Sequence, residues 1–590
     1  MDWAAHFAID RHWRRWLAFV WLCLACGILM ERWSSIGWFV LPDTDDNMRM
    51  MQVRGLLGGQ GWYDLRQYRL DPPGGASIHW SRLVDLPIAG LILVGRLFVD
   101  GAAAERMAVA VAPMLAMAAG LAGIALAARR LVDPRSWPLA VALLVGAGST
   151  MAMWKPLRID HHGWQLALLI LMVAGIADRG RARGGIVAGL ATAASLTIGL
   201  ELMPYMALGG ALLILWWVAV PAEAPRVRAY AASLAGGSAA GFLAFASYDN
   251  RLPVCDALSP VWLSATLAAG GVAWLMARAP LRTMPQRLAA AAVAGAVLAV
   301  GFALAWPQCL ARPEHLSPEL TRDWFDNVRE AKPVYQHGWR IALQTLALPL
   351  AGAAGAIWAA IRRRSAPWAI VAILSVTATA LLFWQTRAGP AAQLLAVPGA
   401  TAAAFAAMAA LLPRRAWLAV PGVCLTFFAM SGLWAQAVVD GVARFGPAAP
   451  ASKTRRIVNR ANARCPSLPA LRPIARLPKA VVLTFVDLGP RLITVTHHDA
   501  IAGPYHRNAA AILDIHRAFR RTDPAVAHDV MRRHGATLLL ICPGMSEMTL
   551  YATQDPKGFY MQLQRGRVPA WLAPVPLPAS SPFRLWRRVG

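Results

Sequence analysis

The chain has 590 residues, of which 57% are apolar, and its mean hydropathy is +0.45. This composition excludes a single soluble domain and predicts a polytopic α-helical membrane protein. The formal net charge is +27, but Lys and Arg occur in small clusters between apolar runs, which is typical of the cytoplasmic loops of membrane proteins. We therefore expect no nucleic-acid partner.

The first apolar run covers residues 16–41 and follows a cluster of Arg11, Arg14 and Arg15. No small-residue cleavage site follows this run. We therefore interpret it as a membrane helix that is retained, and not as a cleavable signal peptide.

Further apolar runs recur along the chain, each close to the roughly 20 residues that span a bilayer as a helix. They cover residues 106–128, 137–153, 164–177, 184–203, 205–220, 228–246, 261–277, 288–306, 339–361, 367–385, 390–412 and 417–438. With the first run they predict about thirteen transmembrane helices. A shorter run, 86–99, is left over. We expect it to lie on the outer membrane surface, because counting it as a span would reverse the sides of all later loops against the positive-inside rule.

With the run 86–99 on the surface, the basic loops all fall on the cytoplasmic side. Their basic residues are Arg129, Arg130, Arg135, Arg179, Arg181, Arg183, Arg226, Arg228, Arg278, Arg282, Arg287, Arg362, Arg363, Arg364, Arg414 and Arg415. The N-terminus is then cytoplasmic in a bacterial inner membrane. The outer side collects the first loop (42–105), the turn at Asp160, the loop 309–338 and Arg387.

Towards the C-terminus the composition becomes that of a soluble protein. We therefore divide the chain into a membrane domain, 1–443, and a small periplasmic α/β domain, 444–590. In the second domain, apolar patterning and length predict strands at 480–485, 492–496 and 536–541 and helices at 508–520 and 524–534.

Cysteines on the outer side lie in a compartment where disulfides form. The chain has seven cysteines. We predict a disulfide between Cys465 and Cys542 in the C-terminal domain. Cys255 and Cys309, both in outer loops, are a second candidate pair.

An acidic cluster, Asp43, Asp45 and Asp46, follows the first apolar run in the segment Pro-Asp-Thr-Asp-Asp-Asn-Met-Arg-Met (42–50). Charge at the edge of a hydrocarbon layer is costly unless it is paired, solvated or bound to a metal. Asp is also a favoured N-cap residue, so the cluster could cap a helix that begins near Asn47. The segment by itself leaves both interpretations open.

Asp160 and His162 lie in the segment Arg-Ile-Asp-His-His-Gly-Trp (158–164), at an outer turn between two predicted membrane helices. Their oxygen and nitrogen atoms can ligate one cation, and Mg²⁺ or Mn²⁺ acting on phosphates uses such sparse protein ligation. Surface histidines often have no such role. The predicted topology, however, places this segment, with Arg158 and His161, beside the acidic cluster.

Other charged residues also fall on the outer side. Glu330 lies in an amphipathic segment, Trp-Phe-Asp-Asn-Val-Arg-Glu-Ala (324–331), where it could instead pair with a neighbouring Arg or Lys. Arg387 stands at the outer end of a helix, where it needs an anionic partner such as a lipid-linked phosphate. Glu201, near the outer end of its helix, is a partner for Arg158, a helix-packing residue or a further site candidate.

In the order and sidedness of these residues, the chain resembles the catalytic-subunit family of oligosaccharyltransferases, which are membrane glycosyltransferases of the GT-C fold. The family comprises the eukaryotic subunit and single-subunit bacterial and archaeal enzymes. The resemblance covers the whole layout and implies about thirteen membrane helices, a first outer loop with surface helices and a C-terminal domain outside. Asp45 followed by Asp46 is similar to the family's first acidic motif, with Asp43 and Asp46 as alternatives for the key position.

The other motifs follow in the family's order. The segment from Asp160 to His162 is similar to the second motif, Asp-x-Asp or Asp-x-His. Val-Arg-Glu330 resembles the outer-loop motif whose glutamate contacts both metal and acceptor, and Arg387 resembles the arginine that holds the donor's phosphate. The resemblance thus implies a divalent cation, Mg²⁺ or Mn²⁺, with the ligands Asp45, Asp160, His162 and Glu330.

Phe-Val-Asp-Leu-Gly (485–489) stands where the family has Trp-Trp-Asp-Tyr-Gly, which reads the hydroxyl residue of the Asn-x-Ser/Thr acceptor. Both Trp and the Tyr are missing here, so the acceptor class stays open. The nearby polar run Thr-His-His-Asp-Ala-Ile-Ala-Gly-Pro-Tyr-His-Arg-Asn (496–508) is suited to approach the site, but the resemblance implies no role for it.

We therefore predict a metal-dependent inverting glycosyltransferase with Asp45, Asp46 and Glu330 as catalytic candidates. It would move a sugar or oligosaccharide from a polyprenyl phosphate or pyrophosphate carrier to a protein, lipid or glycan acceptor at the outer face of the membrane. One alternative is a single-sugar transferase that modifies a lipid or surface polysaccharide. A transporter or flippase is another, which the lack of internal repeats and of midplane charges disfavours.

Overall fold

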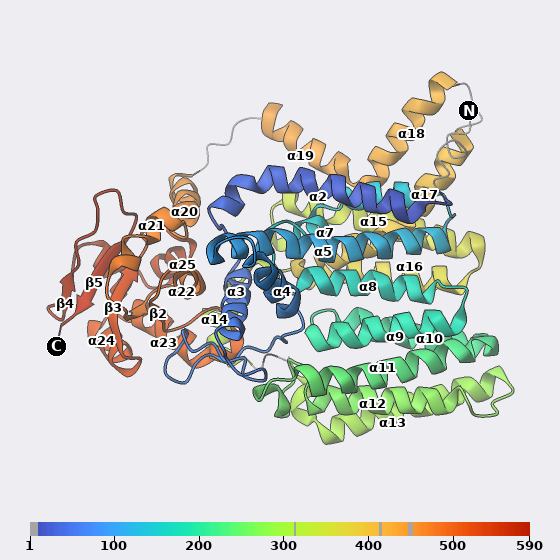
Figure 1. The fold of residues 1–590 in the computed structure, drawn as a ribbon, viewed down its shortest axis with the longest axis horizontal. Helices are drawn as coiled ribbons and strands as arrows, with labels where there is room; N and C mark the ends of the chain where they lie inside the picture. Colours follow the sequence, from blue (N-terminus) through green and yellow to red (C-terminus); the bar gives the residue numbers. More distant parts are fainter. Residues whose placement is uncertain (1–9, 312–313, 315, 412–415, 446–451, 590) are drawn as a thin grey trace.

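The computed structural model of the chain describes residues 10–311, 314, 316–411, 416–445 and 452–589. Long helices lying side by side form one half of the molecule, and a five-stranded sheet with its own helices forms the other (Figure 1). Short helices and loops lie between the two halves. The helices and the sheet have separate hydrophobic cores.

The helical half follows the apolar runs of the sequence. Its α-helices are α2 (Trp13–Gly37), α3 (Thr44–Leu57), α4 (Asp85–Gly95), α5 (Gly101–Leu131), α6 (Trp137–Val145), α7 (Gly148–Ala152), α8 (His162–Ile176), α9 (Arg181–Ile198), α10 (Met203–Ala219), α11 (Ala224–Phe245), α12 (Pro260–Met276), α13 (Met284–Ala305), α14 (Pro318–Asp323), α15 (Trp339–Arg363), α16 (Ala366–Leu381), α17 (Gly389–Leu411), α18 (Ala416–Ser431) and α19 (Leu433–Phe445).

In the part of the chain that the structure describes, five helical segments are long and apolar enough to cross a membrane. They are α2, α5, α13, α15 and the segment Thr386–Leu411, which contains α17. The most apolar window of α13 has no buried residue at all. Such a helix is stable against lipid, where its exposed apolar side chains need no protein partner. These are the helices of a multi-pass membrane protein.

Two predicted spans are each built from two helices. The run 137–153 divides into α6 and α7, with Gly146 in the break. The run 417–438 divides into α18 and α19, which are bent by 83°. Gly432 between them has a φ of +72°, a conformation that glycine adopts without steric cost and that ends a right-handed helix. Arg414 and Arg415, predicted in a cytoplasmic loop, lie outside the described residues.

The loops between the helices gather at two ends of the helical half. At the basic end, Arg363 donates to the carbonyl of Leu131 at 2.7 Å, and Arg287 donates to the carbonyl of Val218 at 2.9 Å. These two contacts join basic residues of α15 and α13 to the ends of α5 and α10, so these basic segments lie at the ends of neighbouring helices. The opposite end faces the sheet half, with α3 and the short α4 between them (Figure 1).

The sheet has the strand order β2-β1-β3-β5-β4, in which β1 is parallel to β2 and β3, and β5 is antiparallel to β3 and β4. The strands are β1 (Val481–Leu483), β2 (Asp499–Ala500), β3 (Ala536–Ile541), β4 (Leu572–Pro574) and β5 (Arg584–Arg588). The helices of this half are α20 (Lys453–Arg464), α21 (Leu468–Leu471), α22 (Gly489–Val495), α23 (Ala509–Arg520), α24 (Pro524–Arg533), α25 (Ser546–Gln554) and α26 (Phe559–Gln564).

The predicted strand 492–496 is wrong, because these residues form most of α22. Pro490 stands at the start of that helix, a position that suits its fixed φ. A short apolar run has no periodicity that separates a strand from a buried helix. Its apolar side chains Leu492 and Ile493 are fully buried in the core of the sheet half.

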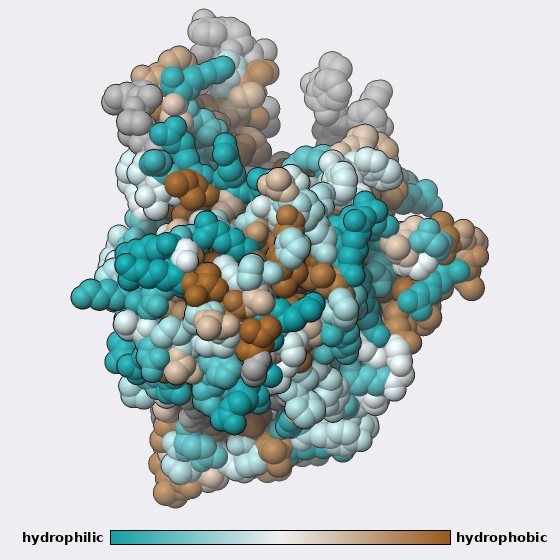
Figure 2. Space-filling model, turned by 90° about the vertical axis from the view of Figure 1, so that its left-hand side faces the viewer, coloured by the Kyte–Doolittle hydropathy of each residue, from teal (hydrophilic) through white to brown (hydrophobic). Residues whose placement is uncertain are grey.

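The sheet half docks onto α3 through α22. Oγ1 of Thr494 donates to the carbonyl of Asn47 at 3.2 Å, and Nη1 of Arg491 donates to the carbonyl of Phe39 at 2.9 Å. Hydrophilic residues cover most of the face that the sheet half turns away from the helices (Figure 2). The ends of the helices and the sheet half thus enclose α3 and its acidic residues.

Candidate active site

The acidic cluster lies at the start of α3, which begins directly after Asp43 and not near Asn47 as expected. Asp43 is the N-cap residue, but its side chain accepts no hydrogen bond from the helix backbone. It accepts one from Nη1 of Arg158 at 2.8 Å instead. Capping therefore does not explain this carboxylate. Asp45 and Asp46 lie in the first turn, where the helix dipole favours negative charge.

Arg158 connects α3 with the turn between α7 and α8. Its guanidinium donates to Asp46 at 3.1 Å and to Asp160 at 2.5 Å. The other oxygen of Asp46 accepts from the backbone N–H groups of Ile159 and Asp160. The carboxylate of Asp46 is fully buried, and a buried charge is stable only when it is paired and hydrogen-bonded in this way. We call Arg158, Asp43, Asp46 and Asp160 the Arg158 cluster.

The two histidines of this turn point to different partners. Their rings stack with centroids 4.4 Å apart. Nδ1 of His162 lies 3.3 Å from Oδ2 of Asp160. Nε2 of His161 lies 2.9 Å from Oε1 of Glu201, and Oε2 of Glu201 accepts from Gln165 at 2.8 Å. Glu201 is therefore a partner of His161 and not, as one expectation had it, of Arg158.

Glu330 and Arg387 lie on two neighbouring 3-10 turns, η5 (Arg329–Ala331) and η7 (Thr386–Ala388). The backbone N–H and the hydroxyl of Thr386 both donate to the carbonyl of Lys332, at 2.9 and 2.5 Å. Within the described residues Glu330 pairs with neither Arg329 nor Lys332. The turns that carry the predicted metal-binding glutamate and phosphate-binding arginine are thus held against each other. The Arg387 guanidinium lies over the Phe325 ring, 5.9 Å from its centroid, and among the described residues neither Glu330 nor Arg387 forms an ion pair.

Negative charge is in excess where these segments meet. Burial raises the pKa of Asp45 well above its ordinary value, and the carboxylates of Asp43, Asp160 and Glu330 add to the effect. Burial acts in the same direction on Asp160, but the Arg158 guanidinium outweighs it and leaves the pKa of Asp160 below its ordinary value. The Arg158 guanidinium is therefore shared by several carboxylates. Carboxylate oxygens beside one imidazole, that of His162, are ligands that suit Mg²⁺ or Mn²⁺.

The sheet half adds two residues to this site. Oη of Tyr505 donates to the carbonyl of Thr44 at 2.9 Å, and the Tyr505 ring lies edge-on to Trp80 with centroids 5.7 Å apart. Desolvation of the Asp487 carboxylate raises its pKa to about 6, and the Asp43 carboxylate contributes. The segment 485–489, which differs from the family motif, and the polar run 496–508 therefore both reach the acidic cluster.

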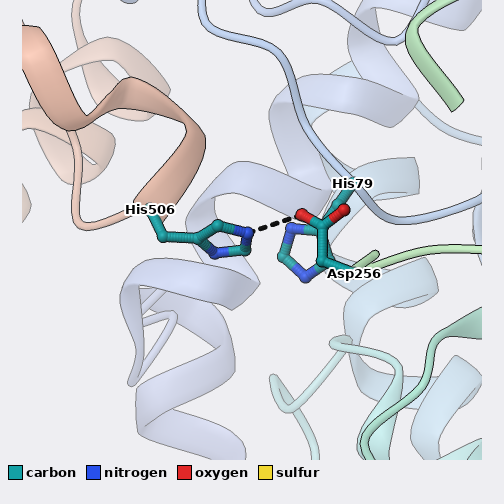
Figure 3. A group of neighbouring side chains, drawn as sticks. All are labelled: His79, Asp256 and His506. Carbon is teal, nitrogen blue, oxygen red and sulfur yellow. Dashed lines mark hydrogen bonds and ion pairs between the residues drawn. The ribbon is translucent and has the colours of Figure 1, made fainter. Parts of the chain in front are cut away.

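A second group with metal-ligand residue types, His79, Asp256 and His506, lies in the same region (Figure 3). Their ligand atoms lie within 4.8 Å of one another. Both oxygens of Asp256 accept from Arg507, at 2.6 and 2.8 Å, and one also lies 2.6 Å from Nε2 of His506. Two like unit charges 4 Å apart repel by about 4 kcal/mol at an effective dielectric constant of about 20. The guanidinium therefore disfavours a cation at this group.

Sequence reasoning did not find His79, Asp256, Tyr505 or Arg507 as parts of one region. The run 496–508 is conspicuous for its polar residues, but His506 and Asp256 are 250 positions apart. No local pattern announces such a contact. The dense polar run was the one signal in the sequence that could have led to Tyr505 and Arg507.

No protein-family model matches the sequence, and the comparison with curated proteins finds no match. Solved structures do match. An archaeal oligosaccharyltransferase, AglB from Archaeoglobus fulgidus, in complex with an inhibitory peptide and a dolichol-phosphate, superposes with a TM-score of 0.67 at 14% identity, over 94% of this chain and 72% of that chain.

Other structures of the Archaeoglobus fulgidus enzyme give the same result. The form tethered to an acceptor peptide with the NVT sequon has a TM-score of 0.67 at 13% identity, over 92% of this chain and 71% of that chain. The complex with Zn and sulfate has a TM-score of 0.55 at 14% identity, over 85% and 64%. At this level of identity the likeness concerns the fold, and the chain therefore has the GT-C fold of an oligosaccharyltransferase.

Proposed function

We propose that the chain is a metal-dependent, inverting glycosyltransferase that moves a sugar or oligosaccharide from a polyprenyl phosphate or pyrophosphate carrier to an acceptor. The observation that carries this proposal is that Asp45 lies near enough to Asp160, His162 and Glu330 to interact with them electrostatically, and that Nδ1 of His162 lies 3.3 Å from Oδ2 of Asp160. An AglB structure of this fold contains a dolichol-phosphate and an inhibitory peptide, which supports a lipid-linked donor.

Asp45, Asp160, His162 and Glu330 are the residues that would hold the cation. When bound, a divalent cation supplies a Lewis acid that neutralises the charge developing on the leaving phosphate. Asp160 needs a fixed orientation for this role, and Arg158 provides it through the 2.5 Å ion pair. Asp46 orients the same turn by accepting from the backbone of Ile159.

The remaining steps are assigned to side chains of the chain itself. Arg387 donates hydrogen bonds to the donor's phosphate, where positive charge stabilises the leaving group. The acceptor's nucleophile attacks the anomeric carbon on the face opposite the phosphate, and the bond from that carbon to the phosphate oxygen breaks. Glu330 or a carboxylate of the acidic cluster orients the nucleophile and takes its proton.

The domain division and sidedness remain part of the proposal. Residues 1–443 would form the membrane-embedded catalytic domain with a cytoplasmic N-terminus, and residues 444–590 would form a periplasmic domain. The gathering of the acidic residues at the end opposite the basic loops supports this arrangement. The same gathering argues against a transporter, because a transported ion or solute needs charged groups near the middle of the bilayer.

The acceptor is more consistent with a lipid or glycan than with a peptide. Phe485, at the first Trp position of the family motif, is fully buried and packs against Phe519 with ring centroids 5.5 Å apart. Val486, at the second, is buried as well. These side chains cannot read a Ser or Thr of an acceptor peptide. A single-sugar transferase acting on a lipid or surface polysaccharide is therefore the second candidate function.

The test uses the purified full chain in lipid vesicles with a labelled, polyprenyl-pyrophosphate-linked oligosaccharide. We expect transfer that a chelator stops and that Asp45→Ala and Glu330→Ala each remove. Full, chelator-insensitive transfer by both variants would contradict the site. A peptide with Asn-Val-Thr and a glycolipid serve as alternative acceptor probes, and the labelled product distinguishes the two candidate functions.

A further inference from the structure

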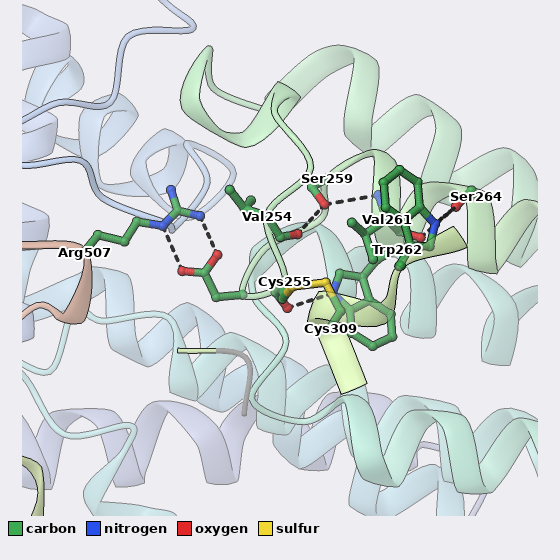
Figure 4. The surroundings of a disulfide bond; sticks show 10 residues. Val254, Cys255, Ser259, Val261, Trp262, Ser264, Cys309 and Arg507 are labelled. Atoms are coloured by element: carbon green, nitrogen blue, oxygen red, sulfur yellow. Dashed lines mark hydrogen bonds and ion pairs between the residues drawn. A yellow bond between two sulfur atoms is a disulfide. The ribbon is translucent and has the colours of Figure 1, made fainter. Parts of the chain in front are cut away.

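The loop that carries Asp256 is braced by a disulfide. The predicted bond between Cys255 and Cys309 is present and joins the loop between α11 and α12 to the segment after α13 (Figure 4). The carbonyl of Cys255 also accepts from Nε1 of Trp262 at 2.8 Å, and Oγ of Ser259 donates to the carbonyl of Val254 at 2.6 Å. Asp256 follows Cys255 directly, so its backbone has little freedom.

The partners of Asp256 come from the sheet half. Arg507 forms the two-bonded ion pair, and the side chains of Arg507 and Asp256 are only 12% and 9% exposed. Nη1 of Arg507 also donates to Oδ1 of Asn250 at 2.8 Å, and Nδ2 of Asn250 donates to the carbonyl of His79 at 3.0 Å. Asp256, His506 and Arg507, which we call the Asp256 clamp, therefore link the sheet half to two loops of the helical half.

The clamp lies next to a residue that touches the candidate active site. Tyr505 directly precedes His506, and its hydroxyl donates to the carbonyl of Thr44, between Asp43 and Asp45 in the chain. The segment 505–507 is thus held at one end by α3 and at the other by Asp256. A largely buried pair with two parallel hydrogen bonds, such as Asp256 with Arg507, fixes both the distance and the orientation of its two members.

We propose that Asp256, braced by the Cys255–Cys309 disulfide, is a positioning residue. Its bonds to His506 and Arg507 keep Tyr505 against the first turn of α3, and Tyr505 there forms the acceptor side of the active site. We assign Tyr505 to the acceptor side because of its position relative to the proposed phosphate ligand. Tyr505 lies between α3 and the sheet half, whereas Arg387, the proposed phosphate ligand, lies on η7. The inference rests on the proposed function for its kinetic consequence but not for its structural one.

The structural consequence is tested by amide hydrogen exchange of the full chain in vesicles. We expect Asp256→Asn, Arg507→Lys and the double variant Cys255→Ser/Cys309→Ser each to speed exchange in residues 503–510 at least tenfold. Asp529→Asn is the matched control, because Asp529 pairs with Arg532 and Arg533 on the surface of the same half. Unchanged exchange in Arg507→Lys and the serine variant would overturn the clamp, even if Asp256→Asn fails to fold.

The kinetic consequence is tested with the labelled donor and whichever of the Asn-Val-Thr peptide and the glycolipid is glycosylated. We expect Asp256→Asn and Arg507→Gln each to raise the KM for the acceptor about tenfold, while the KM for the donor changes less than twofold. A merely structural loss would lower kcat through the active fraction and leave both KM values unchanged. The double variant Asp256→Asn/Arg507→Gln should raise the acceptor KM by less than the product of the two single effects, because the two residues share one ion pair.

The outcomes separate the two proposals. If the wild type transfers nothing to either probe, the proposed function fails, and the exchange measurement still decides the clamp. If the wild type transfers and the acceptor KM of both single variants stays within twofold of wild type, the clamp is wrong and the proposed function stands.

Discussion

Two arginine-centred clusters meet at the junction of the helical and sheet halves, and they differ in their balance of charge. In the Arg158 cluster one guanidinium bonds three carboxylates, and Asp45 and Glu330 lie close by. In the Asp256 clamp one carboxylate is bonded by a guanidinium and an imidazole. The Arg158 cluster therefore keeps negative charge in excess, while the carboxylate of the Asp256 clamp is already paired with basic side chains.

The difference teaches that residue types alone do not identify a cation site. His79, Asp256 and His506 have the composition of a metal site, yet the carboxylate already bonds Arg507. Asp45 raises the opposite expectation, because its carboxylate has no partner among the described side chains, and burial together with neighbouring carboxylates raises its pKa. We expect carboxylates in excess over their basic partners to bind a cation, and a carboxylate that is fully paired with basic side chains to stabilise the structure.

The largest expected effect comes from breaking the Arg158 cluster. Asp160→Asn removes a proposed ligand and one partner of Arg158, so we expect initial transfer rates to fall about 10³-fold. Asp178→Asn is the matched control: Asp178 is also a buried, arginine-paired carboxylate, but it lies at the basic end. We expect its rate to stay within about threefold. A rate of Asp160→Asn within tenfold of wild type would remove Asp160 from the site.

A buried ion pair between α3 and α4 sharpens the comparison. Arg49 donates to Asp85 at 2.7 Å, and both side chains are fully buried. Asp85 also lies 3.4 Å from the buried Arg82 guanidinium. Asp85→Asn therefore removes the carboxylate that serves both arginines and should lower the free energy of unfolding by about 3–5 kcal/mol, as measured by denaturant unfolding of the full chain in detergent. Arg181→Gln, in a pair whose arginine is 49% exposed, should cost no more than about 1 kcal/mol. Equal losses of unfolding free energy in Asp85→Asn and Arg181→Gln would contradict the distinction between the buried and the partly exposed ion pair.

Cation dependence separates the two clusters directly. We expect Asp45→Asn to raise the Mn²⁺ concentration that gives half-maximal transfer by roughly tenfold or more, since a ligand charge is lost. Binding of Mn²⁺ to the protein, followed by electron paramagnetic resonance, should weaken in parallel. Asp256→Asn should leave both quantities within twofold. If Asp256→Asn weakens Mn²⁺ binding as much as Asp45→Asn does, the assignment of the two clusters is reversed.

The smallest effect concerns another contact between the halves. His534 lies 3.0 Å from Asp514 and 2.9 Å from Asp71, and these bonds raise its pKa to about 9. The stabilisation is complete below the unfolded pKa of about 6.5 and is lost as pH rises through about 9. We expect it to contribute about 1–2 kcal/mol, because water screens part of the interaction.

The measurement is the pH dependence of the melting temperature. Wild type should lose stability between pH 7 and pH 9.5 relative to His534→Gln, and the two curves should converge at high pH. Curves that stay parallel over this range would show that His534 is not charged in the folded protein.

Local pattern predicted much of the fold. The bounds of β3 agree with the apolar run that predicts it, and both predicted disulfides, Cys255–Cys309 and Cys465–Cys542, are present. Pattern failed at 492–496, where a short apolar run is helical. It also missed β4 and β5, whose arginines and prolines conceal a pleated face until β5 pairs with β3.

The sequence by itself predicted that the chain is a membrane protein, which basic loops share an end, and which acidic segments are candidates for the site. Those features depend on composition and on short motifs, which act within a few residues. Only the tertiary structure decided that Asp43 bonds Arg158 instead of capping its helix, that Glu201 serves His161, and that Asp256 meets Arg507. Such pairs depend on charge balance across distant segments, which no local pattern encodes.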